Sequence, residues 1–202
     1  MKAKICGITN LEDALLAANN GAWAIGFNFY KNSPRYVSIQ KAKEITVQLP
    51  KHIIKVGILI DYSQDEMLDA LEFLNLVQIY QQNPSLFFDK KRIILALQAS
   101  YKDELPASSI LQEYEFILID ALRQQDGLLG GTGRLANWDL AKELAKNYKL
   151  ILAGGLNSSN ALAAIKHVKP FAVDVASGVE ERPGIKNPLA IKEFLMRCKN
   201  VK

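Results

Sequence analysis

Two side chains that could exchange protons each end a short apolar run in this sequence. Cys6 ends the run Ala3–Cys6, and Asp120 ends the run Phe116–Asp120. A free thiol titrates near pH ~8.5, so a modest shift makes it a base near neutral pH. An Asp carboxyl becomes a useful acid once burial or nearby negative charge raises its pKa. Each residue has an ordinary alternative, a packed thiol for Cys6 and a turn or helix cap for Asp120.

Glycines gather in the second half of the sequence, each group following an apolar run. They occur as Gly130-Gly131-Thr132-Gly133, as Gly154-Gly155, and at Gly178 beside Ser177. Glycine lets backbone N–H groups approach an anion closely, and nearby helix N-termini favour negative charge. The two later groups therefore indicate phosphate-binding loops, with tight turns between elements as the alternative.

Arg35 follows Ser33-Pro34, and its planar guanidinium suits a carboxylate or a phosphate. An ordinary surface arginine is the alternative interpretation. His52 and His167 lie away from the expected strand ends, so the sequence supports neither a His-based triad nor a metal site. The only other cysteine, Cys198, is far along the chain, which gives no disulfide framework and predicts a packed thiol.

Short β-branched runs alternate with helical patterns from end to end, which favours parallel βα units. Strands are predicted at Ala3–Cys6, Trp23–Phe29, Lys55–Ile60, Leu76–Ile79, Arg92–Leu97, Phe116–Asp120, Leu150–Ala153 and Ala172–Val175. Eight units in 202 residues come near the lower size limit of a (β/α)8 barrel, roughly 200 residues. An open doubly wound sheet is the alternative, but it commonly has five or six strands at about this length. We predict a single (β/α)8 TIM barrel over residues 1–202.

Helix starts are marked by capping residues. Caps are predicted at Asn10, at the Ser63–Glu66 capping box, near Asn137 and Asn157, and at Asn187-Pro188. Two helices are weakly patterned, a short one around Pro84–Phe88 and one ending near Glu113. In such a barrel the active residues would lie at the carboxyl ends of the strands, where the loops that lead into the helices begin.

The composition is typical of a globular protein, with 49% hydrophobic residues, 23% charged residues and a net charge of +4. The basic residues are scattered, so we expect a small anionic substrate and no nucleic-acid partner. No apolar stretch approaches the roughly 20 residues that cross a bilayer, and the first residues lack a secretory pattern. We therefore expect a reduced, cytoplasmic protein with no membrane partner.

A series of motifs along nearly the whole chain resembles the phosphoribosylanthranilate isomerase family. They are Lys4–Thr9, Gly26–Tyr30 with Ser33–Tyr36, Lys55–Ile58, Leu76–Ile79, Asp120, Gly130–Gly133 with Trp138, Leu152–Asn157, Val173–Glu180 and Pro183–Lys186. Each motif alone is modest, but all of them in this order are highly specific. The chain departs from the family pattern at Tyr80-Gln81, where His-Gly is usual. Milder departures are Arg134 for Lys, and Asn137 and Asn187 for Asp.

The resemblance implies a (β/α)8 barrel that rearranges N-(5′-phosphoribosyl)anthranilate to its 1-deoxyribulose form in tryptophan biosynthesis, with no cofactor or metal. In that reaction Cys6 would be the general base that removes the C2′ proton. Asp120 would be the general acid that protonates the ribose ring oxygen, and Arg35 would hold the anthranilate carboxylate. The remaining substrate-binding residues would be Gly154, Gly155, Ser177 and Gly178 at the phosphate, and Asp174. Both monomers and homodimers are compatible with the family.

Two other functions are alternatives to this isomerase activity. The related isomerase of histidine biosynthesis performs the same chemistry on a larger substrate, but that family has Asp where this chain has Cys6 and shows a half-barrel repeat that is not evident here. The second is a barrel that binds a phosphorylated ligand without turning it over. The Tyr80-Gln81 change is the only support for that reading.

Overall fold

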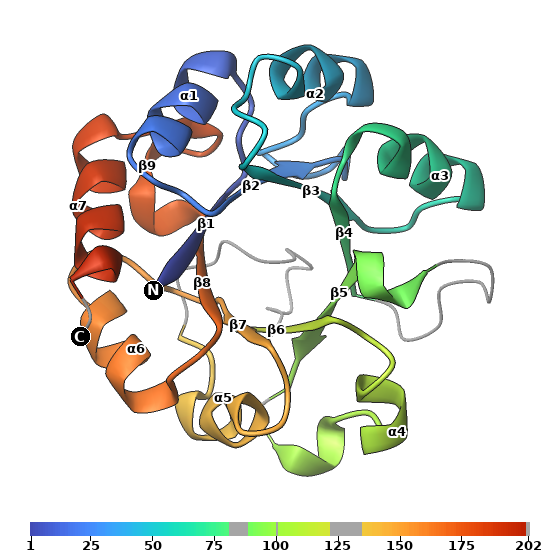
Figure 1. Ribbon diagram of the computed structural model, residues 1–202, viewed down its shortest axis with the longest axis vertical. Helices are drawn as coiled ribbons and strands as arrows, with labels where there is room; N and C mark the ends of the chain where they lie inside the picture. Colours follow the sequence, from blue (N-terminus) through green and yellow to red (C-terminus); the bar gives the residue numbers. More distant parts are fainter. Residues whose placement is uncertain (81–88, 100, 122–134, 201–202) are drawn as a thin grey trace.

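A computed structural model describes residues 1–80, 89–99, 101–121 and 135–200. Eight parallel strands form a closed barrel in sequence order, with β8 returning to pair with β1 (Figure 1). The strands are β1 (Lys2–Cys6), β2 (Ala24–Asn28), β3 (Ile54–Leu59), β4 (Leu76–Ile79), β5 (Ile93–Gln98), β6 (Phe116–Asp120), β7 (Leu150–Leu152) and β8 (Ala172–Val175). The predicted (β/α)8 barrel is confirmed, and the open sheet is excluded because the sheet has no edge.

Helices surround the barrel in Figure 1. The α-helices are α1 (Leu11–Asn19), α2 (Ile39–Thr46), α3 (Gln64–Phe73), α4 (Ser108–Leu111), α5 (Trp138–Ala145), α6 (Ala161–Val168) and α7 (Pro188–Lys199). The described residues also form the 3₁₀ turns η1 (Lys90–Arg92), η2 (Lys102–Glu104) and η3 (Ser177–Val179). A small antiparallel pair consists of β9 (Glu180–Arg182) and β10 (Ile185–Lys186). Within the described ranges, no helix combines the length and apolarity that a bilayer crossing requires.

Most predicted boundaries agree with the structure to within one residue. The bounds of β4, β6 and β8 are as predicted, whereas β2 is shorter than the predicted Trp23–Phe29 at both ends. The weak pattern ending near Glu113 corresponds to η2 and the four-residue α4. The helix predicted around Pro84–Phe88 lies outside the described residues.

Capping side chains begin the helices as expected, with one exception. Asn10, Asn137 and Asn187 accept hydrogen bonds from first-turn N–H groups, and Ser63 forms the predicted capping box. The prediction near Asn157 was wrong by about one turn, because α6 begins at Ala161. Asn157 instead accepts from the N–H groups of Ser159 and Asn160 in a preceding turn.

The barrel has an outer and an inner core. The outer core lies between strands and helices and includes Ile25, Met67 and Phe194. The inner core is formed by alternate strand residues such as Val56 and Leu118, which point to the barrel axis. Both layers are apolar, and they fix the strand ends that carry the polar residues.

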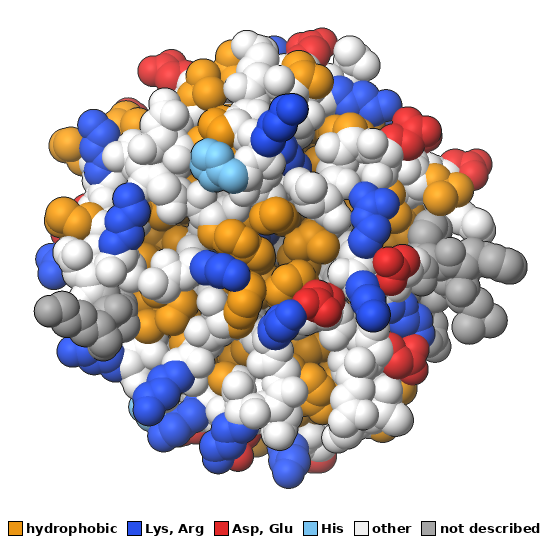
Figure 2. Space-filling model, viewed as in Figure 1, with side chains coloured by type: hydrophobic (Ala, Val, Ile, Leu, Met, Phe, Trp, Pro, Cys, Tyr) orange, Lys and Arg blue, Asp and Glu red, His pale blue; other side chains and the backbone are white. Residues whose placement is uncertain are grey.

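Aromatic rings close the amino end of the barrel. Trp23 and Phe171 precede β2 and β8, and Phe116 begins β6; their ring centroids lie 5.4–6.0 Å apart. The Lys2 ammonium covers this cluster, 4.1 Å from the Phe171 ring centroid. On the face turned to the viewer in Figure 2, hydrophobic side chains gather over the centre of the barrel among lysines and arginines. The cavity lined by polar residues lies at the other end of the barrel, at the carboxyl ends of the strands.

Candidate active site

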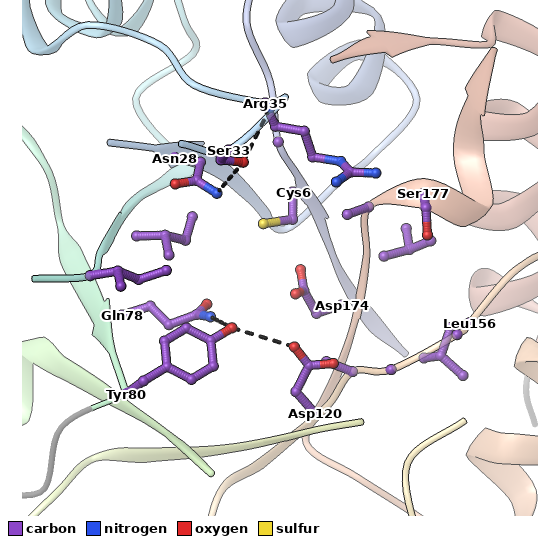
Figure 3. Close-up of a pocket in the computed structure, with 18 residues that line it drawn as sticks. Cys6, Asn28, Ser33, Arg35, Gln78, Tyr80, Asp120, Leu156, Asp174 and Ser177 are labelled. Carbon is purple, nitrogen blue, oxygen red and sulfur yellow. Dashed lines mark hydrogen bonds between the residues drawn. The ribbon is translucent and has the colours of Figure 1, made fainter. Parts of the chain in front are cut away.

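A single cavity at the carboxyl ends of the strands collects almost all the predicted site residues (Figure 3). The predicted residues that line it are Cys6, Arg35, Asp120, Gly154, Gly155, Asp174 and Ser177. They come from β1, β6, β8 and the loops after β2, β7 and β8, so the barrel brings together residues that are remote in sequence. Gly178 is not among the lining residues.

A buried ion pair lies inside the barrel below Cys6. The Lys4 ammonium is fully buried, donates to Asp174 Oδ1 at 2.9 Å, and donates to Gln78 Oε1 at 3.2 Å. Burial alone would lower the pKa of Lys4, but Asp174 and Cys6 outweigh it and the pKa is raised. The lysine therefore carries a fixed positive charge within the cavity floor.

The Cys6 thiol is partly exposed and points into the cavity in Figure 3. Gly26 on the neighbouring strand leaves it room, because a Cβ there would lie 3.0 Å from Sγ and 3.1 Å from Cε of Lys4. Burial raises the pKa of the thiol, and the positive charges of Lys4 and Lys186 oppose that rise. A thiolate at Cys6 would thus have a cation beneath it as its counter-charge.

The Asp120 carboxyl lies at the end of β6 and also points into the cavity. Oδ1 accepts from the Ala121 N–H at 2.8 Å, and Oδ2 accepts from the Tyr80 hydroxyl at 3.4 Å. Burial is the main cause that raises its pKa to about 6, with Asp174 adding to the rise. Asp120 can therefore hold a proton near neutral pH, as a general acid requires.

Arg35 is held at the cavity rim by a carboxylate. Its Nε and Nη2 both contact Glu180, at 2.9 and 2.7 Å, and Lys186 Nζ donates to the same carboxylate at 2.9 Å. Burial raises the pKa of Glu180, but the two cations outweigh it and the pKa is lowered. Gly7, at φ +74°, makes room for this arrangement, because a Cβ there would lie 2.6 Å from Cδ of Arg35.

The loops after β7 and β8 contact each other through glycine. Gly154 and Gly155 have φ values of +82° and +61°, in the left-handed region that glycine favours. A Cβ on Gly178 would lie 1.9 Å from the Leu156 carbonyl oxygen. Gly178 therefore brings the two loops together, while Ser177, Gly154 and Gly155 face the cavity.

Several residues that line or support the site were not identified from the sequence. Lys4 and Gln78 form the polar floor, and Glu180 with Lys186 fixes Arg35. One signal for Lys4 was available, since a lysine inside an otherwise apolar strand must be paired when buried. The partner of Arg35 could not be found in this way, because Glu180 lies 145 positions away in sequence.

The other singled-out residues lie elsewhere. Cys198 is buried in α7, as predicted for a packed thiol, and His167 contacts Asp139 on the outside of the barrel. His52 is exposed in the turn before β3. The glycine-rich loop at 130–133, with Arg134 and Gln81, lies outside the described residues.

The closed barrel and the position of its cavity define this protein as a TIM-barrel enzyme. The family model described as N-(5'phosphoribosyl)anthranilate (PRA) isomerase matches residues 3–197, and the chain belongs to this family. The predicted activity, isomerisation in tryptophan biosynthesis, agrees with this membership.

Relatives and solved structures agree with this assignment. N-(5'-phosphoribosyl)anthranilate isomerases of Syntrophus aciditrophicus and Thermotoga maritima are 40% and 38% identical, over 95% and 100% of this chain and 84% and 100% of theirs. The crystal structure of the Thermotoga maritima enzyme matches with a TM-score of 0.85 at 37% identity, covering 98% of each chain. A structure in complex with reduced 1-(o-carboxyphenylamino)-1-deoxyribulose 5-phosphate matches with a TM-score of 0.83 at 36% identity, also over 98% of each chain.

Proposed function

We propose that the chain converts N-(5′-phosphoribosyl)anthranilate to 1-(2-carboxyphenylamino)-1-deoxyribulose 5-phosphate with Asp120 as general acid and Cys6 as general base. Asp120 gives its proton to the ribose ring oxygen. The bond between this oxygen and C1′ breaks, and the nitrogen lone pair forms a C1′=N double bond. The Cys6 thiolate then removes the C2′ proton, and the electrons of that C–H bond form the enolamine, which tautomerises to the ketone.

The observation that carries this proposal is that Cys6 and Asp120 face one cavity in suitable electrostatic surroundings. The raised pKa of Asp120, about 6, favours the proton that an acid needs. Burial and Asp174 raise the pKa of the Cys6 thiol, and the positive charge of the Lys4 ammonium close to it opposes that rise and favours the thiolate that a base needs. Fixed charges of this kind need no rearrangement during the reaction.

Arg35 would bind the anthranilate carboxylate at the cavity rim. Glu180 occupies Nε and Nη2, and among the described residues Nη1 has no acceptor, so one edge of the guanidinium is available for an incoming carboxylate. The phosphate would lie on the opposite loops, against Gly154, Gly155 and Ser177, with Gly178 bringing those loops together. Asp174, which is bound to Lys4, would contact the sugar between these two anchors.

Further parts of the proposal concern the protein as a whole. Residues 1–202 would act as one barrel domain, in the cytoplasm and without a cofactor or metal, because an acid and a base suffice for this rearrangement. The partner would be the phosphosugar substrate alone, with no nucleic acid or membrane. The protein would be a monomer or a homodimer; a Thermotoga maritima relative is described as dimeric and has also been solved as generated monomers.

Steady-state turnover, followed as the loss of phosphoribosylanthranilate fluorescence, tests the two catalytic roles. Cys6→Ser and Asp120→Asn should each lower kcat by at least about a hundredfold, since general acid–base catalysis contributes typically 10²–10⁴-fold. Both variants should bind the reduced product analogue nearly as tightly as the unaltered protein. A near-normal kcat in Cys6→Ser would refute the base assignment. An unaltered protein that binds the analogue without turnover would instead favour a binding barrel.

A further inference from the structure

Tyr80 is a lining residue whose hydroxyl contacts Asp120 directly. It follows β4, two strands from β6, is partly buried, and projects toward Asp120 in Figure 3. Its hydroxyl accepts from Gln78 Nε2 at 3.2 Å and donates to Asp120 Oδ2 at 3.4 Å. The side chain that departs from the family pattern therefore contacts the proposed acid.

Lys4 determines which group donates in each of these hydrogen bonds. A lysine ammonium has three donors and no acceptor, so Lys4 can bind only the oxygen of the Gln78 amide. The amide NH₂ group must then face Tyr80, which occupies one lone pair of the phenolic oxygen. The Tyr80 hydrogen is left to point at Asp120. The row Lys4–Gln78–Tyr80–Asp120 thus has a single polarity.

We infer that Tyr80 is a positioning residue for the proposed acid: its hydroxyl, oriented by Gln78, holds Asp120 Oδ2 in one orientation and stabilises the carboxylate left when the proton has gone. This inference rests on the proposed role of Asp120. The Ala121 N–H holds the other oxygen, so both carboxyl oxygens have a donor. In this chain the donor to Oδ2 is a phenol, at a position where the family pattern usually has His.

The charges around Asp120 are compatible with this role. Asp174 on β8 raises its pKa, whereas Tyr80 and Lys4 lower it through a hydrogen bond and a positive charge. The Cys6 thiol on β1 also raises the pKa of Tyr80. Glu104 of η2 and Tyr80 together line a second cavity. Burial raises the pKa of Tyr80 well above its usual value, and Asp120, Cys6 and Asp174 add to the rise, so the phenol keeps its proton and remains a donor.

Tyr80→Phe tests the inference by removing one oxygen atom. The ¹³C resonance of the Asp120 carboxyl should titrate in the unaltered, ligand-free protein with a midpoint near pH 6. In Tyr80→Phe the midpoint should rise by about 0.4–1 pH unit, the equivalent of one hydrogen bond, and toward the lower value because the contact is long. In the pH profile of kcat/KM, the apparent pKa that belongs to Asp120 should rise by the same amount.

Tyr114→Phe is a matched control. Tyr114 is buried, and its hydroxyl has no hydrogen-bond partner in the part of the chain that the structure describes. It should leave both readouts unchanged. An unmoved Asp120 midpoint in Tyr80→Phe, with or without a lower kcat, would overturn the inference, because a merely structural tyrosine alters stability or rate without moving that pKa. A moved midpoint with an unmoved kinetic profile would instead refute Asp120 as the acid, and with it the role of Tyr80 in positioning an acid.

Discussion

Replacing Glu180 by glutamine removes one negative charge from between two buried cations. The Glu180 carboxylate accepts from Arg35 Nε and Nη2, from Lys186 Nζ, and from the Gly184 N–H. The Lys186 side chain is fully buried, and those of Arg35 and Glu180 are 11% and 4% exposed, so water cannot replace the lost partner. Glutamine has the same shape but only one acceptor oxygen, and it leaves both cations without a counter-charge.

The expected cost is a loss of about 3 kcal/mol in the free energy of unfolding at pH 7. Removing one member of a buried pair costs about 3–5 kcal/mol, because the remaining charge is uncompensated. We expect the lower value because Lys186 keeps a hydrogen bond to the Ala176 carbonyl and can lose its proton, burial having lowered its pKa. Urea unfolding followed by circular dichroism measures the difference.

The pH dependence gives an independent check. The folded-state pKa of Glu180 is lowered, so its contribution is complete above the unfolded value of about 4.3 and disappears as pH falls through the folded value. The gap between Glu180→Gln and the unaltered protein should therefore close in acid. As a control, Glu143→Gln removes an exposed partner of Lys146 and should have little effect. A loss below about 1 kcal/mol at pH 7, or a gap that persists in acid, would refute the reasoning.

Two further substitutions test the energetics of the site. Asp120→Asn should stabilise the fold at pH 8 by up to about 2–3 kcal/mol, because a folded pKa of about 6 against an unfolded value of about 3.9 costs stability above pH 6 and nothing below about pH 4. Thermal melts at pH 8 and pH 4 measure this, and equal effects at both would contradict it. Gly178→Ala should destabilise by about 2–3 kcal/mol, since its Cβ would lie 1.9 Å from the Leu156 carbonyl oxygen and the backbone must move. An unchanged urea midpoint would show that the two loops do not need this contact.

The strands were predictable because local pattern and burial agree. The runs at β4, β6 and β8 are short and aliphatic and are buried on both faces of the barrel, so their bounds follow from composition. Asn10 and Ser63 were recognisable as caps for a similarly local reason. The predicted helix cap near Asn157 was misplaced, because the Asn157 side chain caps a turn that precedes α6.

The positions of Cys6 and Asp120 were predictable from strand ends, but their surroundings were not. The raised pKa of Asp120 depends on burial and on Asp174, and the hydrogen bond from Tyr80 to Asp120 joins residues 40 positions apart. Arg35 was predicted to hold a carboxylate of the substrate, but its pairing with Glu180 through two of its nitrogens was not predicted. Such contacts arise only when the barrel closes, and no single stretch of sequence contains them.

The central claim is that Cys6 and Asp120 act on opposite parts of one sugar, and a crystal structure with reduced 1-(o-carboxyphenylamino)-1-deoxyribulose 5-phosphate tests it most directly. We expect Cys6 Sγ in contact with C2 of the analogue, and an Asp120 oxygen within hydrogen-bond reach of O4, the former ring oxygen, at about 2.6–3.2 Å. The carboxylate should lie on Arg35 and the phosphate on the loops after β7 and β8. A complex in which C2 lies beyond contact of Sγ, or in which O4 faces away from Asp120, would contradict the account.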